Sequence, residues 1–247
     1  MNGSLIKLVS PERDVRRIAK AQREASWEHY RQSEFYSQLL RLLDLDAPIP
    51  STRSWAASPD VLLSLLHHAK QSNPKTILDA GCGLGYTTTV IAELLPEAHV
   101  LGIDLAEDAI AYATSTHKNA SFGVVALDPS AERIGSFDLI FCFEIYPFSR
   151  NRDVAYQSQL IKNLSENLSS SGKIIISQTW RNKDALPPVL GEVTEMCPDL
   201  LFQVVSYPHP RIPLWLPRKL ALYAAKVVEK LTGKEVVKKL IVISKRA

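Results

Sequence analysis

The stretch Thr76–Glu93, TILDAGCGLGYTTTVIAE, constrains the fold of this chain more than any other segment. It opens with the apolar pair Ile77-Leu78, passes an acid at Asp79, and then places glycine at three alternating positions. From Thr88 onward the apolar spacing is helical, so the order predicts a buried strand, a tight turn and a helix N-terminus. Such a turn suits a ligand that closely approaches the backbone, because glycine has no Cβ and the helix N-terminus offers free N–H groups.

The spacing of Gly81, Gly83 and Gly85 separates two kinds of ligand. A dinucleotide fingerprint reads G-x-G-x-x-G and rests a pyrophosphate on the helix. Here the third glycine comes one residue early, and Tyr86 stands where close packing would favour a small residue. Asp79 would repel a pyrophosphate, whereas it suits a ligand that carries an amino group. A plain glycine-rich turn without a ligand is the alternative.

Beyond Lys75, strand-like apolar runs alternate with helical patterns. The expected strands are 76–80, 99–104, 121–128, 136–146, 172–180, 201–207 and 236–246, and the expected helices are 86–95, 106–117, 151–168 and about 188–196. Repeated βα units predict a parallel sheet covered on both faces. The segment 208–235, between the last two strands, is too long for a hairpin loop and is expected to be a helical insertion.

Two segments of the chain flank this pattern. Residues 1–70 are expected to form a helical N-terminal lid, and residues 71–247 the ligand-binding domain. Within 212–231 the apolar residues make one stripe, from which Arg218, Lys219, Lys226 and Lys230 largely point away. The favoured interpretation is an insertion helix that packs on the sheet with a solvated polar face. A basic amphipathic helix can instead rest on an anionic membrane.

Charge and cysteine content add two expectations. From Arg211 to the end the chain has 10 Lys/Arg and 2 Glu, a local charge of +8, while the preceding 210 residues carry −5. Cys82, Cys142 and Cys197 are odd in number, which argues against a disulfide framework and favours a cytoplasmic location. No Cys/His cluster has metal-ligand spacing, so no metal is expected.

The motif D-A-G-C-G-L-G at 79–85 resembles the first motif of the class I S-adenosylmethionine (SAM) methyltransferases. The resemblance continues in order over residues 75–180, through G-I-D, L-D, F-D-L-I-F-C-F-E and G-K-I-I-I-S. It implies a doubly wound, mostly parallel, Rossmann-like sheet of seven strands, with the seventh antiparallel beside the fifth, and SAM as cofactor. The cofactor-binding residues that it implies are Asp79, Gly81, Cys82, Gly83, Asp104, Leu105, Leu127, Asp128 and Phe143.

Two further acids carry specific expectations. Asp104 ends the second strand, where a carboxylate can accept hydrogen bonds from both ribose hydroxyls; an N-cap for the next helix is the alternative. Under the resemblance, Asp128 faces the adenine amino group, with Leu127 beside the ring. The alternative is that Asp128-Pro129-Ser130 is simply a turn.

The hexapeptide 143–148, F-E-I-Y-P-F, should face the reacting methyl group, because ligands of open α/β sheets sit beyond the carboxyl ends of the strands. Glu144 is the catalytic candidate: it can act as a base or orient a substrate amine or hydroxyl. It can equally be a group that holds the SAM-binding loop. Tyr146 is expected in the substrate pocket, with Tyr30 and Trp180.

The sequence therefore predicts a SAM-dependent methyltransferase that acts on an oxygen or nitrogen of a small organic substrate, natural products included. A membrane-associated lipid or quinone methyltransferase and a non-catalytic SAM-binding module are the alternatives. Nucleic acid is not an expected partner, because the chain lacks both the D/N-P-P-aromatic motif of base methylation and a basic, aromatic stacking surface. The acceptor and the oligomeric state are left open.

Overall fold

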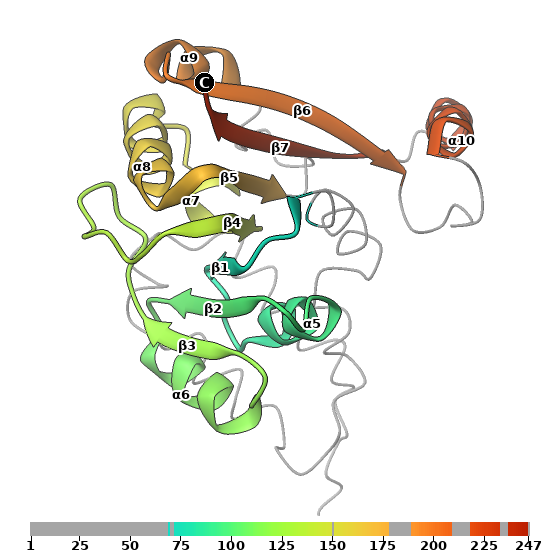
Figure 1. Cartoon of the computed structure of the whole chain (residues 1–247). Helices are drawn as coiled ribbons and strands as arrows, with labels where there is room; N and C mark the ends of the chain where they lie inside the picture. Colours follow the sequence, from blue (N-terminus) through green and yellow to red (C-terminus); the bar gives the residue numbers. More distant parts are fainter. Residues whose placement is uncertain are drawn as a thin grey trace, which may run out of the picture.

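The computed structural model describes residues 69, 72–149, 151–177, 189–208, 218–232 and 237–246 (Figure 1). The strands are β1 (Thr76–Ala80), β2 (His99–Asp104), β3 (Ser121–Val124), β4 (Phe137–Phe143), β5 (Leu168–Ser177), β6 (Leu200–Pro208) and β7 (Val237–Lys245). The helices are α5 (Tyr86–Leu94), α6 (Glu107–Thr116), α7 (Tyr146–Ser149), α8 (Val154–Glu166), α9 (Leu190–Met196) and α10 (Arg218–Thr232).

The strands form one sheet in the order β3-β2-β1-β4-β5-β7-β6. Strand β7 is antiparallel to both β5 and β6, and the other pairs are parallel. The predicted sheet of seven mostly parallel strands, with the seventh beside the fifth, is confirmed. The chain winds outward from β1 to β3 and then returns to place β4 on the other side of β1, so the β1–β4 boundary is the switch point where such sheets bind ligands.

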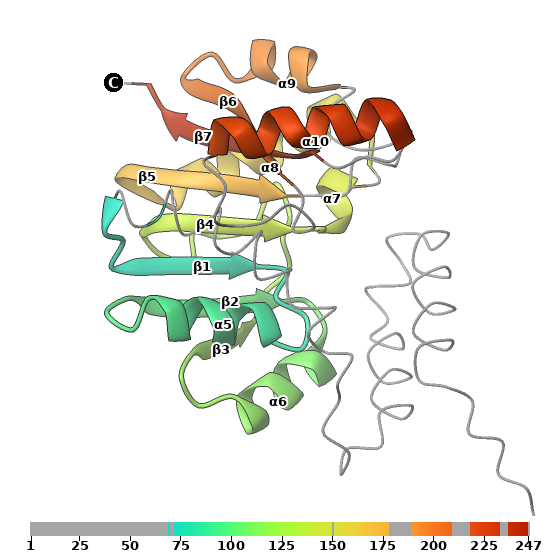
Figure 2. The same ribbon diagram turned by 90° about the vertical axis from the view of Figure 1, so that its right-hand side faces the viewer.

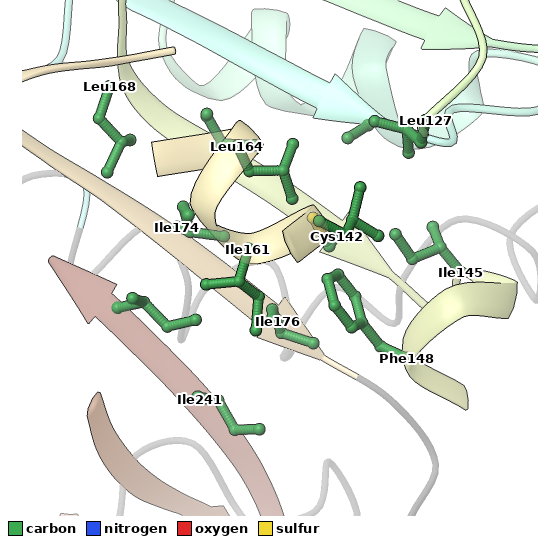
Figure 3. Close-up of a cluster of buried hydrophobic side chains, with 14 of the residues drawn as sticks. Leu127, Cys142, Ile145, Phe148, Ile161, Leu164, Leu168, Ile174, Ile176 and Ile241 are labelled. Carbon is green, nitrogen blue, oxygen red and sulfur yellow. The ribbon is translucent and has the colours of Figure 1, made fainter. Parts of the chain in front are cut away.

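Each face of the sheet has its own apolar core. One core joins the sheet to α8 and α9, and Figure 3 shows part of it, with Cys142 near Phe148 and Ile161. The other joins Ile77, Phe141 and further strand residues to Ile91 of α5. Figure 2 shows α5 and α10 in front of the sheet and α8 behind it. A strand such as β4, buried on both faces, is therefore apolar at nearly every position.

Two predicted strands end earlier than expected. The third was predicted to run to Asp128, but β3 ends at Val124 because β2, the neighbour that pairs with it, already ends at Asp104. The fourth was predicted to run to Tyr146, but β4 ends at Phe143. The next residue, Glu144, has a left-handed φ of 49°, which extended structure does not allow. As a result, Asp128 lies in the loop that follows β3, and Tyr146 begins α7.

Other boundaries shift for local reasons. The predicted helix 151–168 begins only at Val154, because Asp153 is its N-cap and accepts a 3.0 Å hydrogen bond from the Tyr156 N–H. Strand β5 begins at Leu168 rather than 172, with a register irregularity where it pairs with the start of β4.

Several predictions lie outside the described residues. Of the predicted N-terminal lid 1–70, only Ala69 is described, and Tyr30 and Trp180 are not. Of the predicted insertion 208–235, the structure describes Pro208 and α10. The division into lid, domain and insertion remains a prediction.

The carboxylate of Asp138, on β4, joins three segments at the amino end of the sheet. It accepts hydrogen bonds from the Lys75 N–H at 2.8 Å, from the N–H and hydroxyl of Thr76 at 3.2 and 3.4 Å, and from the Ser169 hydroxyl at 2.7 Å. Partial burial acts to raise the pKa of Asp138, but these hydrogen bonds outweigh it and lower the pKa. This acid therefore fixes β1 and β5 against β4.

We predict that Asp138→Ala lowers the free energy of unfolding by about 2 kcal/mol at neutral pH, because hydrogen bonds to a charged acceptor are lost. The pKa of Asp138 is lower in the folded protein than in the unfolded chain, so the ionised carboxylate stabilises the fold at pH values above the unfolded pKa. This stabilisation is lost as the pH falls through the pKa of the folded protein. Urea denaturation should therefore show a gap between the two proteins that narrows on acidification below about pH 4. The exposed Glu166→Ala is the control, and a pH-independent gap would contradict the assignment.

Candidate functional site

The turn between β1 and α5 is built on three left-handed glycines. Gly81, Gly83 and Gly85 have φ values of 78°, 54° and 79°, a region that side chains rarely adopt. A Cβ at Gly81 would lie 2.5 Å from Cγ2 of Ile145, and one at Gly85 would lie 2.7 Å from Cε1 of Phe122. At these two positions, the left-handed backbone and the neighbouring side chains already require glycine, whether or not a ligand is bound.

Asp104 ties the end of β2 to this turn. Its Oδ2 accepts the Gly83 N–H at 2.9 Å, and its Oδ1 accepts the Ala106 N–H at 3.0 Å. The backbone adds to the connection, since the Ile103 carbonyl accepts the N–H groups of Gly81 at 2.8 Å and Cys82 at 2.9 Å. The glycine turn and the acid at the end of β2 therefore converge at one point.

The N-cap interpretation of Asp104 is wrong. The N-cap of α6 is Ala106, and no side chain caps that helix. Asp104 instead accepts a hydrogen bond from the N–H of the N-cap residue, Ala106, and another from Gly83 in the glycine turn. Burial raises the pKa of Asp104, and its hydrogen bonds with the N–H groups of Ala106, Gly83 and Leu105 oppose that shift.

Asp79 lies beneath the turn. Its side chain is 1% exposed and accepts a hydrogen bond from the Thr88 hydroxyl of α5 at 2.6 Å. Burial raises the pKa of Asp79 from 3.8 to about 7; the Thr88 hydrogen bond opposes this and the nearby Asp104 carboxylate adds to it. The structure thus gives Asp79 a role in joining the strand to the helix. Its predicted contact with the ligand's ammonium group stays a prediction.

A cluster of rings, which the sequence analysis missed, supports the outer side of the turn. His117 donates from Nε2 to the Leu84 carbonyl at 3.0 Å, and burial lowers the pKa of His117. The hydroxyls of Tyr86 and Tyr112 lie 2.6 Å apart, and the rings of Tyr86 and His117 meet edge to face at 5.0 Å. These residues come from α5, α6 and the loop after it, so no local sequence pattern connects them.

The residues after β4 approach the turn from the other side. Ile145 is the side chain that fills the space next to Gly81. The side chain of the preceding residue, Glu144, is exposed. The backbone N–H of Glu144 donates to the Ser177 carbonyl at 2.8 Å. Tyr146 opens α7 and is half-buried. The structure therefore brings the predicted catalytic segment next to the predicted cofactor loop.

The residues predicted to face the adenine are placed differently from one another. Leu127 is buried in the core, and Figure 3 shows it beside Cys142. Asp128 accepts the N–H and hydroxyl of Ser130 at 2.9 and 2.5 Å, which shows that a turn forms here. Its predicted contact with the adenine amino group stays a prediction. Burial raises the pKa of Tyr156, and the charge of the Asp128 carboxylate adds to the shift.

Two other predicted cofactor residues have side chains engaged in the fold. Phe143 is half-buried and stacks on Phe141, with ring centroids 5.6 Å apart. The Cys82 thiol is buried and donates to the Gly83 carbonyl at 3.7 Å. All three cysteines are free thiols, and burial raises the pKa of each, so none is an activated nucleophile.

The residue set fits a cationic ligand such as SAM. Two carboxylates, Asp79 and Asp104, lie at the turn, and the segment from Asp79 to Tyr86 contains no lysine or arginine to meet a phosphate. Carboxylate oxygens accept ribose hydroxyls and favour a sulfonium or ammonium group. A pyrophosphate would meet two acidic side chains at the same point, with no basic side chain in this segment to balance its charge.

Known proteins agree with this description. A family model described as "Methyltransferase domain" matches residues 71–234. The chain is 29% identical over 114 residues to putative methyltransferase 235L of Invertebrate iridescent virus 6, a match that covers 46% of this chain and 40% of that protein. It is 32% identical over 120 residues to a malonyl-(acyl-carrier protein) O-methyltransferase of Bacillus anthracis, covering 47% of this chain and 42% of that protein. The matches thus span about two fifths of these curated relatives.

Solved structures share the fold. The plantazolicin methyltransferase BpumL, in complex with a pentazolic desmethylPZN analog and SAH, has a TM-score of 0.55 at 19% identity, covering 95% of this chain and 98% of BpumL. The N-methyltransferase NodS from Bradyrhizobium japonicum WM9, in complex with S-adenosyl-l-homocysteine, has a TM-score of 0.55 at 17% identity, covering 86% of this chain and 98% of NodS.

This chain belongs to the methyltransferase-domain family, which confirms the predicted methyltransferase class, and it has the class I fold of the solved methyltransferases. Two of the solved structures that share this fold contain S-adenosylhomocysteine. The family does not fix the methyl acceptor or the acceptor atom.

The raised pKa of Asp79 predicts an unusual pH dependence of stability. Between pH 3.8 and about 7 the unfolded chain loses this proton while the native state keeps it, so the contribution of Asp79 to the free energy of unfolding falls as pH rises. Asp79→Asn removes the titration and keeps an acceptor for Thr88. The stability of Asp79→Asn relative to the parent should therefore increase from pH 5 to pH 8 in denaturant titrations.

A second variant checks the cause. Thr88→Val removes the hydrogen bond that favours the ionised form of Asp79, so it should raise the pKa of Asp79 further. The pH range over which stability falls should then extend to higher pH than in the parent. An Asp79→Asn difference that stays constant with pH would mean that Asp79 is ionised throughout in the native state.

Proposed function

We propose that this protein transfers the methyl group of SAM to an oxygen or nitrogen of a small organic substrate, and that the turn at 81–85 and Asp104 hold the cofactor. The observation that carries the proposal is the 2.9 Å hydrogen bond between the Gly83 N–H and Asp104, which fixes an acid against the glycine turn at the switch point of the sheet. SAM, when bound, supplies an activated methyl group on its sulfonium sulfur.

In this proposal, Asp104 uses the remaining lone pairs of its oxygens to accept the ribose hydroxyls. Each carboxylate oxygen has two acceptor sites, and the Gly83 and Ala106 N–H groups use one on each oxygen. The Leu105 N–H also donates to this carboxylate, which leaves at least one site for a ribose hydroxyl. The left-handed glycines let the ligand approach the turn, and Leu105, next to Asp104, is expected to lie beside the nucleoside. The acidic surroundings favour the positive charge of the sulfonium.

Glu144 is the residue that we propose to act on the acceptor. It follows β4 directly, its side chain is exposed, and its φ of 49° is a conformation that costs a non-glycine residue about 1–2 kcal/mol. Strain of this kind gathers at functional sites, where it aims a side chain. Glu144 then takes the proton that an acceptor hydroxyl or amine loses, with Tyr146 shaping the pocket.

The catalytic demand on the protein is modest. Aligning the donor and the acceptor can contribute about 7–11 kcal/mol to lowering the barrier. A general base adds roughly 10²–10⁴-fold to the rate where a proton must leave. The curated relative of Bacillus anthracis is an O-methyltransferase and NodS is an N-methyltransferase, so this family fold is used for both acceptor atoms.

Calorimetric titration with SAM and with S-adenosylhomocysteine tests the cofactor assignment. We expect both to bind, NAD not to bind, and Asp104→Ala to weaken SAM binding at least tenfold, because a hydrogen-bonded carboxylate contributes about 1.5–3 kcal/mol. Asp104→Ala also loses its contacts to Gly83 and Ala106, so Asp104→Asn is the milder variant. The exposed Glu107→Gln, on α6, is the matched control.

Thermal unfolding of each variant separates loss of binding from loss of the fold. A folded Asp104→Asn protein that binds SAM as the parent does would contradict the role of Asp104. Binding of NAD with no binding of SAM would contradict the proposed function as a whole.

Replacing Glu144 tests whether its strained backbone serves catalysis. Glycine adopts the left-handed conformation freely, so Glu144→Gly should be neutral or more stable by up to about 1 kcal/mol in denaturant titrations. Its methyl transfer, measured on whichever acceptor a substrate screen identifies, should nevertheless fall by roughly 10²-fold or more.

Glu144→Gln is the companion variant, since it keeps the shape and removes the charge. It should lose activity as Glu144→Gly does while SAM affinity stays unchanged. If Glu144→Gly keeps full turnover, Glu144 is not the base; if it loses SAM affinity instead, the residue serves to hold the cofactor loop.

A further inference from the structure

Helix α10 turns apolar side chains outward, away from the sheet. It lies next to β6 and β7, as Figure 2 shows. The side chains of Leu220, Tyr223 and Leu231 are 56%, 70% and 79% exposed, and Val227 and Val228 are also exposed. The expectation that the apolar stripe of this helix packs on the sheet is therefore wrong for these residues.

These side chains form one continuous face. Leu220, Tyr223, Val227 and Leu231 follow one another at intervals of three and four residues, which places them on one side of an α-helix. We call these four residues, together with Val228, the α10 apolar face. Contiguous apolar surface of this kind marks an interaction site more often than a solvated surface.

Exposed lysines accompany the α10 apolar face. Lys226 and Lys230 are exposed, and they lie four residues apart, on one flank of the helix. They belong to the segment from Arg211 to the end, whose charge of +8 contrasts with the −5 of the preceding residues. An apolar strip with a lysine flank has two features of helices that lie in a membrane interface, where the strip enters the acyl region and the lysines meet anionic headgroups.

The helix is not a candidate for crossing a bilayer. Among the described helices, none is long and apolar enough to span a membrane. The 15 residues of α10 extend over about 22 Å at 1.5 Å per residue, less than the hydrocarbon thickness of about 30 Å. Any membrane contact that it makes is therefore along its length, in the plane of the surface.

We propose that α10 docks this protein on the surface of an anionic lipid bilayer, through the α10 apolar face and the lysines at 226 and 230. Charge complementarity favours this occupant over a second copy of the chain, because two copies would bring the same positive segment together. The apolar face itself argues against nucleic acid, which would use the lysines and leave the leucines in water. This inference concerns α10 alone and does not rest on the identity of the methyl acceptor.

Vesicle flotation with the full-length protein tests the proposal. Vesicles of phosphatidylcholine alone are compared with vesicles of equal parts phosphatidylcholine and phosphatidylglycerol. The protein should float with the anionic vesicles, at least tenfold more than with the neutral ones, and added salt should reduce the binding. Since each lysine near such a surface contributes about 1 kcal/mol, Lys226→Gln with Lys230→Gln should weaken binding about 30-fold.

Matched variants test whether vesicle binding depends on the α10 apolar face or on any exposed apolar side chain. Tyr223→Ser with Leu231→Ser should reduce vesicle binding at least tenfold. Leu201→Ser with Val204→Ser, on β6, removes side chains of similar exposure, 54% and 48%, and should leave binding unchanged. Lys75→Gln with Lys162→Gln, two exposed lysines elsewhere, is the charge control.

Three results would overturn the proposal. They are an absence of binding to anionic vesicles, equal binding to both kinds of vesicle, and an equal loss of binding in the β6 control. A dimer that forms with concentration and disappears in Tyr223→Ser would assign the α10 apolar face to a second copy instead. SAM titration of the vesicle-defective variants should match the parent, so failure here and failure of the methyltransferase proposal are distinguishable.

Discussion

The rest of the site depends on one carbonyl and one carboxylate at the end of β2. The Ile103 carbonyl accepts two N–H groups of the glycine turn, and Asp104, the next residue, accepts a third. A turn of left-handed glycines has a large conformational entropy to lose, so it needs such partners to adopt a single shape. Because both partners belong to a buried parallel strand, the sheet holds the ligand loop rigid before any ligand arrives.

Holding two acids at that point has an electrostatic cost, and we propose that this cost favours a cationic ligand. Asp79 and Asp104 are both buried, and the Asp104 carboxylate disfavours the ionised form of Asp79. A cation placed nearby relieves this repulsion, whereas a phosphate increases it. The same arrangement explains why a glycine-rich βα turn, which binds pyrophosphates elsewhere, suits a sulfonium nucleoside here. The His117 and tyrosine cluster supports the loop from outside without adding a charge at its base.

The sequence was sufficient to predict the features that depend on repeated βα units and on local apolar spacing. The strand–turn–helix of β1 and α5, the acid at the end of β2 and the antiparallel seventh strand beside the fifth depend on short-range patterns and on a family resemblance, and they are confirmed. It could not predict where β3 ends, because that depends on the length of its partner β2. Nor could it predict the ring cluster around Leu84, the left-handed backbone of Glu144, or the outward face of α10, since each results from contacts between distant residues.

The contact between Gly81 and Ile145 has a consequence for how this enzyme can diverge. Cγ2 of Ile145 lies 2.5 Å from the position that a Cβ of residue 81 would take, and Ile145 follows Glu144, which we propose to act on the acceptor. The proposed donor and acceptor sides of the site thus meet at Gly81 and Ile145. A larger or smaller residue at 145, selected to admit a new acceptor, would also press on or release the donor loop. New substrate ranges would therefore arise more readily through segments that do not touch Gly81.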